Sequence, residues 1–107
     1  MFARVTTFDI DTLRISIDDA SARFATEVVP AMREQAGYRG AYLMHTPEGR
    51  GLLVTLWESE AAAEAGVASG YYADQLGKFV TLYRSAPGRD HYEVAFAEAV
   101  APQPEHV

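Results

Sequence analysis

The sequence predicts an α+β protein with a ferredoxin-like order of elements, β-α-β-β-α-β, and a four-stranded antiparallel sheet. Three observations lead to this prediction: a hairpin in the middle of the chain, a strand-like segment near each end, and two helical regions between them. The composition fits one globular domain, since 49% of the 107 residues are hydrophobic and 22% are charged. We place this domain at residues 1–98. Residues 99–107 contain two prolines and no periodic pattern, so we expect a loose tail there.

The first predicted strand covers residues 1–8, where β-favouring residues place apolar groups on both faces. Ser16 is expected to cap the first helix, because Asp19 follows three positions later as in a capping box. Pro30 inside the helical pattern predicts a kink near Thr26, and Gly37 is expected to end the helical region. The apolar stripe of this helix consists of Ile17, Ala20, Phe24, Val28 and Met32.

A hairpin is predicted between Gly37 and Ser59. PEGR supplies its turn, and the GLLVTLW segment that follows is almost wholly apolar, as expected for a strand covered on both faces. A short apolar run can also be a buried helix, but Val54 and Thr55 favour a strand. The strand before the turn alternates, with Tyr38, Tyr42 and Met44 on one face and Ala41 and Leu43 on the other.

The second helical region is predicted to be broken in two. Ser59 is expected to cap its first part, SEAAAEAGVA, and Ser69 and Gly70 interrupt it. SAPGRD then forms a turn, and residues 91–100 are expected to form the last strand. The second part carries a helical stripe of Tyr72, Leu76, Phe79, Val80 and Tyr83.

Helices on one face of such a sheet leave the other face bare. Because the predicted strands carry hydrophobic residues on both sides, that bare face would be apolar, and soluble monomers rarely expose so large an apolar patch. We therefore expect a homodimer in which two sheet faces pair.

The charge and composition exclude several classes of partner. A net charge of −6 and a single lysine among nine basic residues argue against nucleic acid and anionic membranes. The absence of cysteine removes disulfides, thiolate metal sites and cysteine nucleophiles. No apolar run approaches the roughly 20 residues of a membrane span, and the N-terminus has no long apolar segment. We expect a cytoplasmic protein.

The chain resembles the antibiotic biosynthesis monooxygenase family in three places. These are the spacing of Pro30, Arg33, Gly37, Tyr38 and Gly40, the segment LLVTLWESEAAAEA after the hairpin, and the later segment SGYYADQLGKF. The resemblance covers nearly the whole chain and implies a dimeric α/β barrel with a substrate cavity between the sheet and the helices. The family includes cofactor-independent monooxygenases acting on polycyclic aromatic substrates, haem-degrading enzymes and many proteins of undefined role.

The resemblance implies three functions. The first is a monooxygenase that needs no cofactor and acts on a small aromatic or polyketide-like substrate. The alternative is a non-catalytic protein that binds a small apolar or aromatic ligand in the same cavity. Haem degradation is disfavoured, because the haem-degrading members carry an Asn on the first strand, a Trp on the third and a His on the second helix. Only Trp57 has a counterpart; Thr6 or Thr7 stands near the place of the Asn, and residues 60–84 contain no His.

A candidate catalytic site is expected at one rim of the sheet, where strands one and three would end next to the start of strand four. His91 beside the carboxylate of Asp9 would act as a general base towards a phenol, with Trp57 stacking on an aromatic ligand. Glu58 would lie at the same rim, with Tyr38 nearby. The competing interpretations are ordinary surface charge at strand ends and, for Trp57, a core anchor.

The substrate-binding residues expected in the cavity come from the strands and from both helical regions. The aromatic members at helical spacing equally fit a packed helix face. His45 and His91 fall at opposite ends of the sheet and His106 lies in the tail, so no metal site is expected. The expected binding residues are Trp57, Phe24, Tyr72, Phe79 and Thr6.

Overall fold

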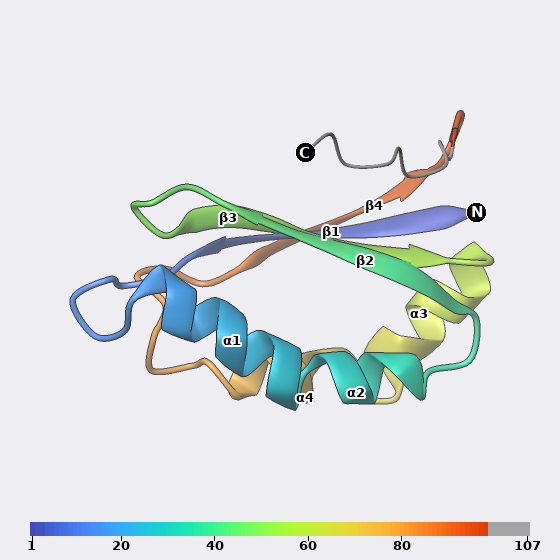
Figure 1. Cartoon of the computed structure of the whole chain (residues 1–107). Coiled ribbons are helices and arrows are strands. Elements are labelled where there is room, and N and C mark those ends of the chain that lie inside the picture. Colours follow the sequence, from blue (N-terminus) through green and yellow to red (C-terminus); the bar gives the residue numbers. More distant parts are fainter. Residues whose placement is uncertain (99–107) are drawn as a thin grey trace, which may run out of the picture.

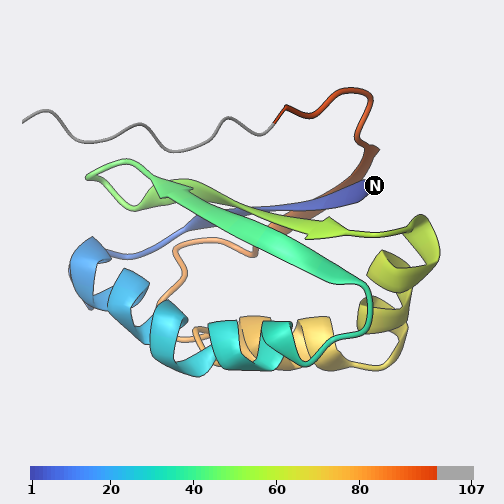
Figure 2. The ribbon, with the colours of Figure 1, turned by 45° about the vertical axis from the view of Figure 1, so that its right-hand side comes forward.

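The computed structural model describes residues 1–98. Four antiparallel strands form one sheet in the order β2-β3-β1-β4, and the helices lie together on one side of it (Figures 1 and 2). The predicted ferredoxin-like α+β fold is thereby confirmed. In chain order the elements are β1 (Phe2–Asp9), α1 (Ile17–Glu27), α2 (Val29–Arg33), β2 (Tyr38–His45), β3 (Arg50–Trp57), α3 (Glu60–Ala68), α4 (Tyr71–Gly77) and β4 (Gly88–Glu93).

The helix boundaries follow the local signals in the sequence. The Ser16 hydroxyl accepts a hydrogen bond from the Asp19 amide at 3.0 Å, and the Ser59 hydroxyl accepts one from the Ala62 amide at 3.1 Å, so both predicted caps are present. Pro30 lies in the first turn of α2, where its missing N–H costs no hydrogen bond, and the break from α1 falls at Val28. Between α3 and α4, Gly70 adopts a left-handed φ of 86°, which confirms the predicted break.

Two predicted elements differ in extent from the observed ones. The helix expected to reach Tyr83 ends at Gly77, because the amides of Phe79 and Leu82 bond three residues back, as in turns. β4 covers residues 88–93 instead of 91–100, so half of the predicted SAPGRD turn is strand. The partner strand sets this limit: Glu93 pairs with Phe2, the first residue of β1. Beyond it the Val94 amide donates one more hydrogen bond, to the Met1 carbonyl at 3.0 Å. Residues 94–98 leave the sheet on the side away from the helices (Figures 1 and 2), and the last two predicted strand residues lie outside the described part.

A bulge in β2 reverses the predicted direction of one side chain. The register with β3 shifts between Tyr38 and Gly40, so Tyr38 packs on the core beside the helices and not with Tyr42 on the outer face. Its ring meets Trp57 edge-on, with 5.8 Å between ring centres. The bulge therefore adds one aromatic ring to the core.

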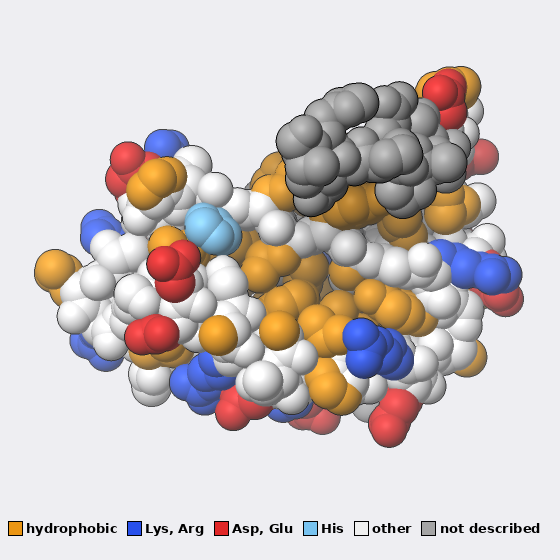
Figure 3. All heavy atoms as spheres, viewed as in Figure 1, with side chains coloured by type: hydrophobic (Ala, Val, Ile, Leu, Met, Phe, Trp, Pro, Cys, Tyr) orange, Lys and Arg blue, Asp and Glu red, His pale blue; other side chains and the backbone are white. Residues whose placement is uncertain are grey.

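The core lies between the sheet and α1, α2 and the turns after α4. Its fully buried centre is Val28, Met32 and Phe79. On the opposite face of the sheet, large hydrophobic side chains are exposed, as the alternation predicts. In the space-filling view, hydrophobic side chains gather in the middle of the molecule, from the sheet down towards the helices, and most charged side chains lie nearer its margins (Figure 3). The exposed residues of the outer sheet face are Tyr42, Met44, Leu52 and Tyr92.

None of the helices in residues 1–98 combines the length and the apolar character needed to cross a membrane.

Candidate functional site

A cavity of about 80 Å³ lies between the sheet and the helices. Side chains two positions apart on a strand share a face, so β1 and β3 each contribute alternate residues to its sheet wall. The helix wall comes from α1, α2, α4 and the turns after α4. The sheet wall includes Arg4, Thr6, Phe8, Leu53, Thr55 and Trp57, and the helix wall includes Phe24, Val28, Met32, Tyr71, Tyr72 and Phe79.

Most of the lining is apolar, but one end of the sheet wall carries an arginine. Arg4 is only 2% exposed, and its guanidinium carbon lies 4.9 Å from the ring centre of Trp57 and 4.6 Å from that of Tyr72. Arg4 Nη2 donates a hydrogen bond to the carbonyl of Ala63 at 3.1 Å, whereas its buried Nε has no partner. No ion pair formed within residues 1–98 includes Arg4. The cavity thus contains a fixed positive charge without an acidic partner.

The surroundings of Arg4 hold the guanidinium in place and perturb it. A side chain on Gly66 of α3 would lie 3.4 Å from the guanidinium, so the glycine leaves space for the arginine. Desolvation by burial lowers the pKa of Arg4, an effect that Tyr72 and Tyr71 oppose and Arg89 reinforces.

Three hydroxyl groups are bound to one another or to the backbone beside Arg4. The hydroxyl oxygens of Thr6 and Tyr72 lie 2.7 Å apart and share a hydrogen bond. Thr55 Oγ1 accepts a hydrogen bond from Trp57 Nε1 at 2.9 Å and donates one to the Arg4 carbonyl at 3.4 Å. These bonds orient both aromatic rings that flank the guanidinium.

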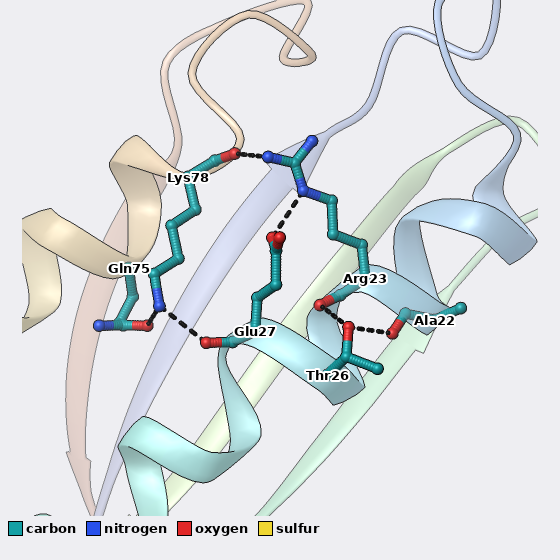
Figure 4. Close-up of polar contacts among 6 residues, drawn as sticks. All are labelled: Ala22, Arg23, Thr26, Glu27, Gln75 and Lys78. Atoms are coloured by element: carbon teal, nitrogen blue, oxygen red, sulfur yellow. Dashed lines mark hydrogen bonds and ion pairs between the residues drawn. The ribbon is translucent and has the colours of Figure 1, made fainter.

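In the helix wall of the cavity, polar contacts hold α1 against the end of α4 (Figure 4). Arg23 donates to the Glu27 carboxylate at 2.7 Å and to the Lys78 carbonyl at 2.8 Å. Lys78 Nζ in turn donates to the Glu27 carbonyl at 2.7 Å and to Gln75 Oε1 at 2.9 Å. The Arg23 guanidinium also covers the ring of Phe79, 5.2 Å from its centre. This arrangement closes the helix wall of the cavity.

All five residues predicted to bind substrate line the cavity: Trp57, Phe24, Tyr72, Phe79 and Thr6. Trp57 is also fully buried, as the core-anchor interpretation requires. Their contact with a substrate remains a prediction.

The predicted gathering of Asp9, Trp57 and His91 at one rim is wrong. Asp9 pairs with Arg50 at one end of the sheet, whereas Trp57 pairs with Phe2 at the other. Because neighbouring antiparallel strands end at opposite edges, the exits of β1 and β3 cannot meet. Asp9 lies outside the cavity, 3.9 Å from Arg84.

His91 lies beside the cavity wall without belonging to its lining. In the sheet it is the direct neighbour of Arg4, and its ring meets Phe2 edge-on at 6.2 Å. Its buried Nε2 has no hydrogen-bond partner. Burial lowers the pKa of His91, and Arg4 and Arg89 lower it further, against a smaller opposite effect of Glu64 and Glu60. A neutral imidazole is therefore favoured.

Arg4 and Arg89 are not among the residues predicted from the sequence to form the site. Arg89 lies opposite Thr6 and places its guanidinium 5.3 Å from the Tyr72 ring centre, so two guanidinium groups lie near this phenol ring. Arg4 could have been found, since a charged residue within a predicted strand that carries apolar groups on both faces is an exception to the usual pattern.

Within residues 1–98, no three His, Cys, Asp or Glu side chains come together in a way that could hold a metal ion.

Comparison with known proteins places these features in context. The family model described as antibiotic biosynthesis monooxygenase matches residues 17–78, more than half of the chain. SnoaB, a cofactor-independent oxygenase from Streptomyces nogalater, is 11% identical with a TM-score of 0.71, covering 90% of this chain and 94% of SnoaB. The heme-degrader MhuD from Mycobacterium tuberculosis is 20% identical with a TM-score of 0.71, and the match covers 92% of this chain and 100% of MhuD. ActVA-Orf6, a monooxygenase from Streptomyces coelicolor, is 20% identical with a TM-score of 0.66, and the match covers 94% of this chain and 92% of ActVA-Orf6. No curated protein matches the sequence.

Proposed function

Because the chain belongs to the antibiotic biosynthesis monooxygenase family, we propose that it is a cofactor-independent monooxygenase that oxidises a small aromatic substrate in the cavity between sheet and helices. One observation carries the proposal: a largely apolar cavity in which the Thr6–Tyr72 hydroxyl pair lies beside Arg4. Apolar walls with a few convergent polar groups are the usual form of a small-molecule site. The fold neighbours SnoaB and ActVA-Orf6 are oxygenases, which supports the proposal of an oxygenase activity.

The reaction needs no external reductant if the substrate is a phenol that becomes a quinone. In the conversion of 1-naphthol and O₂ to 1,4-naphthoquinone and water, the substrate supplies all four electrons that O₂ takes up. One oxygen atom enters the ring and the other leaves as water. The protein then has to bind the ring, exclude water and accept the phenolic proton.

The roles follow from the contacts around the cavity. The rings of Trp57, Phe24 and Phe79 would hold the aromatic substrate, and the Thr6–Tyr72 pair would bind its oxygen. His91 remains the proposed base, since its lowered pKa favours the neutral ring and its Nε2 is unpartnered. A proton would reach it along the side of the cavity at which Arg4 and His91 are neighbours.

The size of the cavity favours substrates of one or two rings. Its volume of about 80 Å³ is well below the roughly 300–1,000 Å³ of sites for drug-sized ligands. A polyketide-like substrate of three or more rings would require the wall to open. Tyr72 and the short helix α4 that carries it are the part best suited to move, because α4 has no fully buried residue.

Oxygen uptake tests the proposal directly. Purified protein with EDTA and without flavin is expected to consume O₂ with 1-naphthol, more slowly with the three-ring anthrone. His91→Gln should lose most of this activity, whereas His45→Gln, an exposed change at the far end of the sheet, should retain it. Uptake no faster than in buffer, with substrate shown to be bound, would contradict the oxygenase.

The alternative function is a protein that binds an aromatic ligand without oxidising it. A specific observation favours it: the cavity lining, all within the described residues, contains no His, Asp or Glu. Saturable binding without O₂ uptake would establish this function. A Soret band on addition of hemin would instead support haem binding, although no His lines the cavity described here.

A further inference from the structure

We propose that the cavity binds an aromatic monocarboxylate and that Arg4 is the counter-ion of its carboxylate. The inference rests on the proposed function only in taking this cavity as the ligand site. It concerns binding and holds whether or not the ligand is oxidised.

The buried charge of Arg4 is only partly compensated by the residues around it. Removing a guanidinium from water is costly unless it is paired, and Arg4 at 2% exposure forms none of the ion pairs within residues 1–98. One hydrogen bond to the Ala63 carbonyl and two aromatic faces compensate only part of this cost. Its Nε is both buried and unpartnered. An anion in the cavity would provide the missing partner.

The charges around the site match a ligand with one negative charge. Arg4 is the single charged residue of the cavity lining. Arg89, the second cation near Tyr72, is exposed, and Glu60 and Glu64 act on the neighbouring His91. These groups leave one uncompensated positive charge inside, too few for a phosphate dianion.

A carboxylate fits this charge better than a phenol does. A phenol titrates near pH 10 and is neutral at physiological pH, whereas a carboxylic acid titrates near pH 4 and arrives already ionised. The planar guanidinium also matches the two oxygens of a carboxylate. A carboxylate would therefore neutralise Arg4 without prior proton transfer.

The rest of the ligand should be a flat ring. The guanidinium lies between Trp57 and Tyr72, and Phe24 and Phe79 complete an aromatic lining. In a cavity of about 80 Å³, one ring bearing a carboxylate uses both the apolar walls and the charged end. We therefore choose benzoate as the probe and benzamide, its uncharged analogue of the same shape, as the control.

Intrinsic fluorescence reports binding, because Trp57 is the sole tryptophan of the chain and lines the cavity. Benzoate is expected to change the emission saturably and to bind at least about tenfold more tightly than benzamide, as a charge-assisted hydrogen bond permits. Arg4→Met, which keeps the length without the charge, should bind both compounds equally. Arg33→Met removes an exposed arginine on α2 and should keep the preference.

Three outcomes would overturn the inference: no saturable change with benzoate, equal affinity for benzoate and benzamide in the unmodified protein, or a benzoate preference that persists in Arg4→Met. Should Arg4→Met fail to fold by circular dichroism, Arg4→Lys retains the charge, and a retained preference for benzoate in it is the expected result. O₂ uptake plays no part in these titrations. Failure of the oxygenase proposal thus leaves the carboxylate test intact, and the reverse also holds.

Discussion

Thr6 on β1 and Tyr72 on α4 share a hydrogen bond of 2.7 Å between their hydroxyl oxygens, although 66 positions separate them in the sequence. The bond joins the sheet wall of the cavity to its helix wall. Because Thr6 is buried, Tyr72→Phe leaves its hydroxyl without a partner, and we expect a loss of about 1–3 kcal/mol in the free energy of unfolding. Denaturant unfolding measures this loss.

A double-mutant cycle tests whether the bond itself is responsible. Adding Thr6→Val to Tyr72→Phe removes both polar groups, so the double variant should be less destabilised than the sum of the single variants. Thr81→Val removes an exposed hydroxyl outside the sheet and should change little. Additive effects of the two substitutions would mean that the bond does not contribute.

The helix limits of the first region and the hairpin could be predicted because their signals are local. Ser16 and Ser59 cap the helices that follow them, and Gly70 divides the second helical region. The direction of Tyr38 could not be read from alternation, since a bulge changes the period by one residue. The φ of 144° at Gly40 allows this bulge, and a glycine inside a strand was its one visible sign.

The candidate site could be predicted only in part. The family resemblance implied a cavity between sheet and helices, and residues assigned to it, such as Thr6 and Trp57, line it. Asp9 was misplaced through the geometry of the sheet, because the predicted antiparallel order already puts the ends of β1 and β3 at opposite edges. Arg4 was not predicted, because β-propensity alone does not distinguish a charged residue at a buried position of a strand.

Gly51 in β3 is expected to be intolerant of any side chain. A methyl group there would collide with the Met44 carbonyl oxygen and with the Phe8 ring. Gly51→Ala should therefore cost about 1–3 kcal/mol or more through overpacking. Gly77→Ala is the matched control, because nothing lies within 4 Å of its added methyl and it ends α4. Thermal unfolding should show a lower Tm for Gly51→Ala and an unchanged or higher Tm for Gly77→Ala; equal Tm values would contradict the packing.

Two half-buried phenols should make the fold sensitive to alkali. Burial raises the pKa of Tyr71 and that of Tyr83 from 10.0 to about 12. Between these values the unfolded chain releases protons that the folded chain keeps, so stability declines as pH rises from 10 towards 12. Unfolding by urea at a series of pH values should show a shallower decline in the Tyr71→Phe/Tyr83→Phe variant. An unchanged slope in the double variant would refute the assignment.

The outer face of the sheet is expected to pair with a second copy of the chain. Tyr42, Leu52 and Tyr92 are exposed there, and a stable dimer interface of about 1,200–2,000 Å² would cover such a face. Light scattering should give twice the chain mass, and Leu52→Glu should give a monomer, because it would bury a charge at the interface. Val80→Glu changes an exposed hydrophobic residue outside the sheet and should leave the dimer intact. A monomeric unmodified protein would contradict the prediction.

His91 should weaken the fold in mild acid. Its pKa is lowered from 6.5 by burial and by Arg4 and Arg89, so below pH 6.5 the unfolded chain takes up a proton before the folded chain does. The free energy of unfolding therefore falls as pH drops through 6.5 towards the lowered pKa, and it stays reduced below that value. His91→Gln removes this proton difference and should flatten the curve, whereas the exposed His45→Gln should not. If His91 is also the base of the proposed oxidation, the acid limb of O₂ uptake with 1-naphthol should lie below pH 6.5, because the neutral ring persists there. An acid limb above 6.5 would show that another group accepts the proton, even if the stability curve behaves as expected.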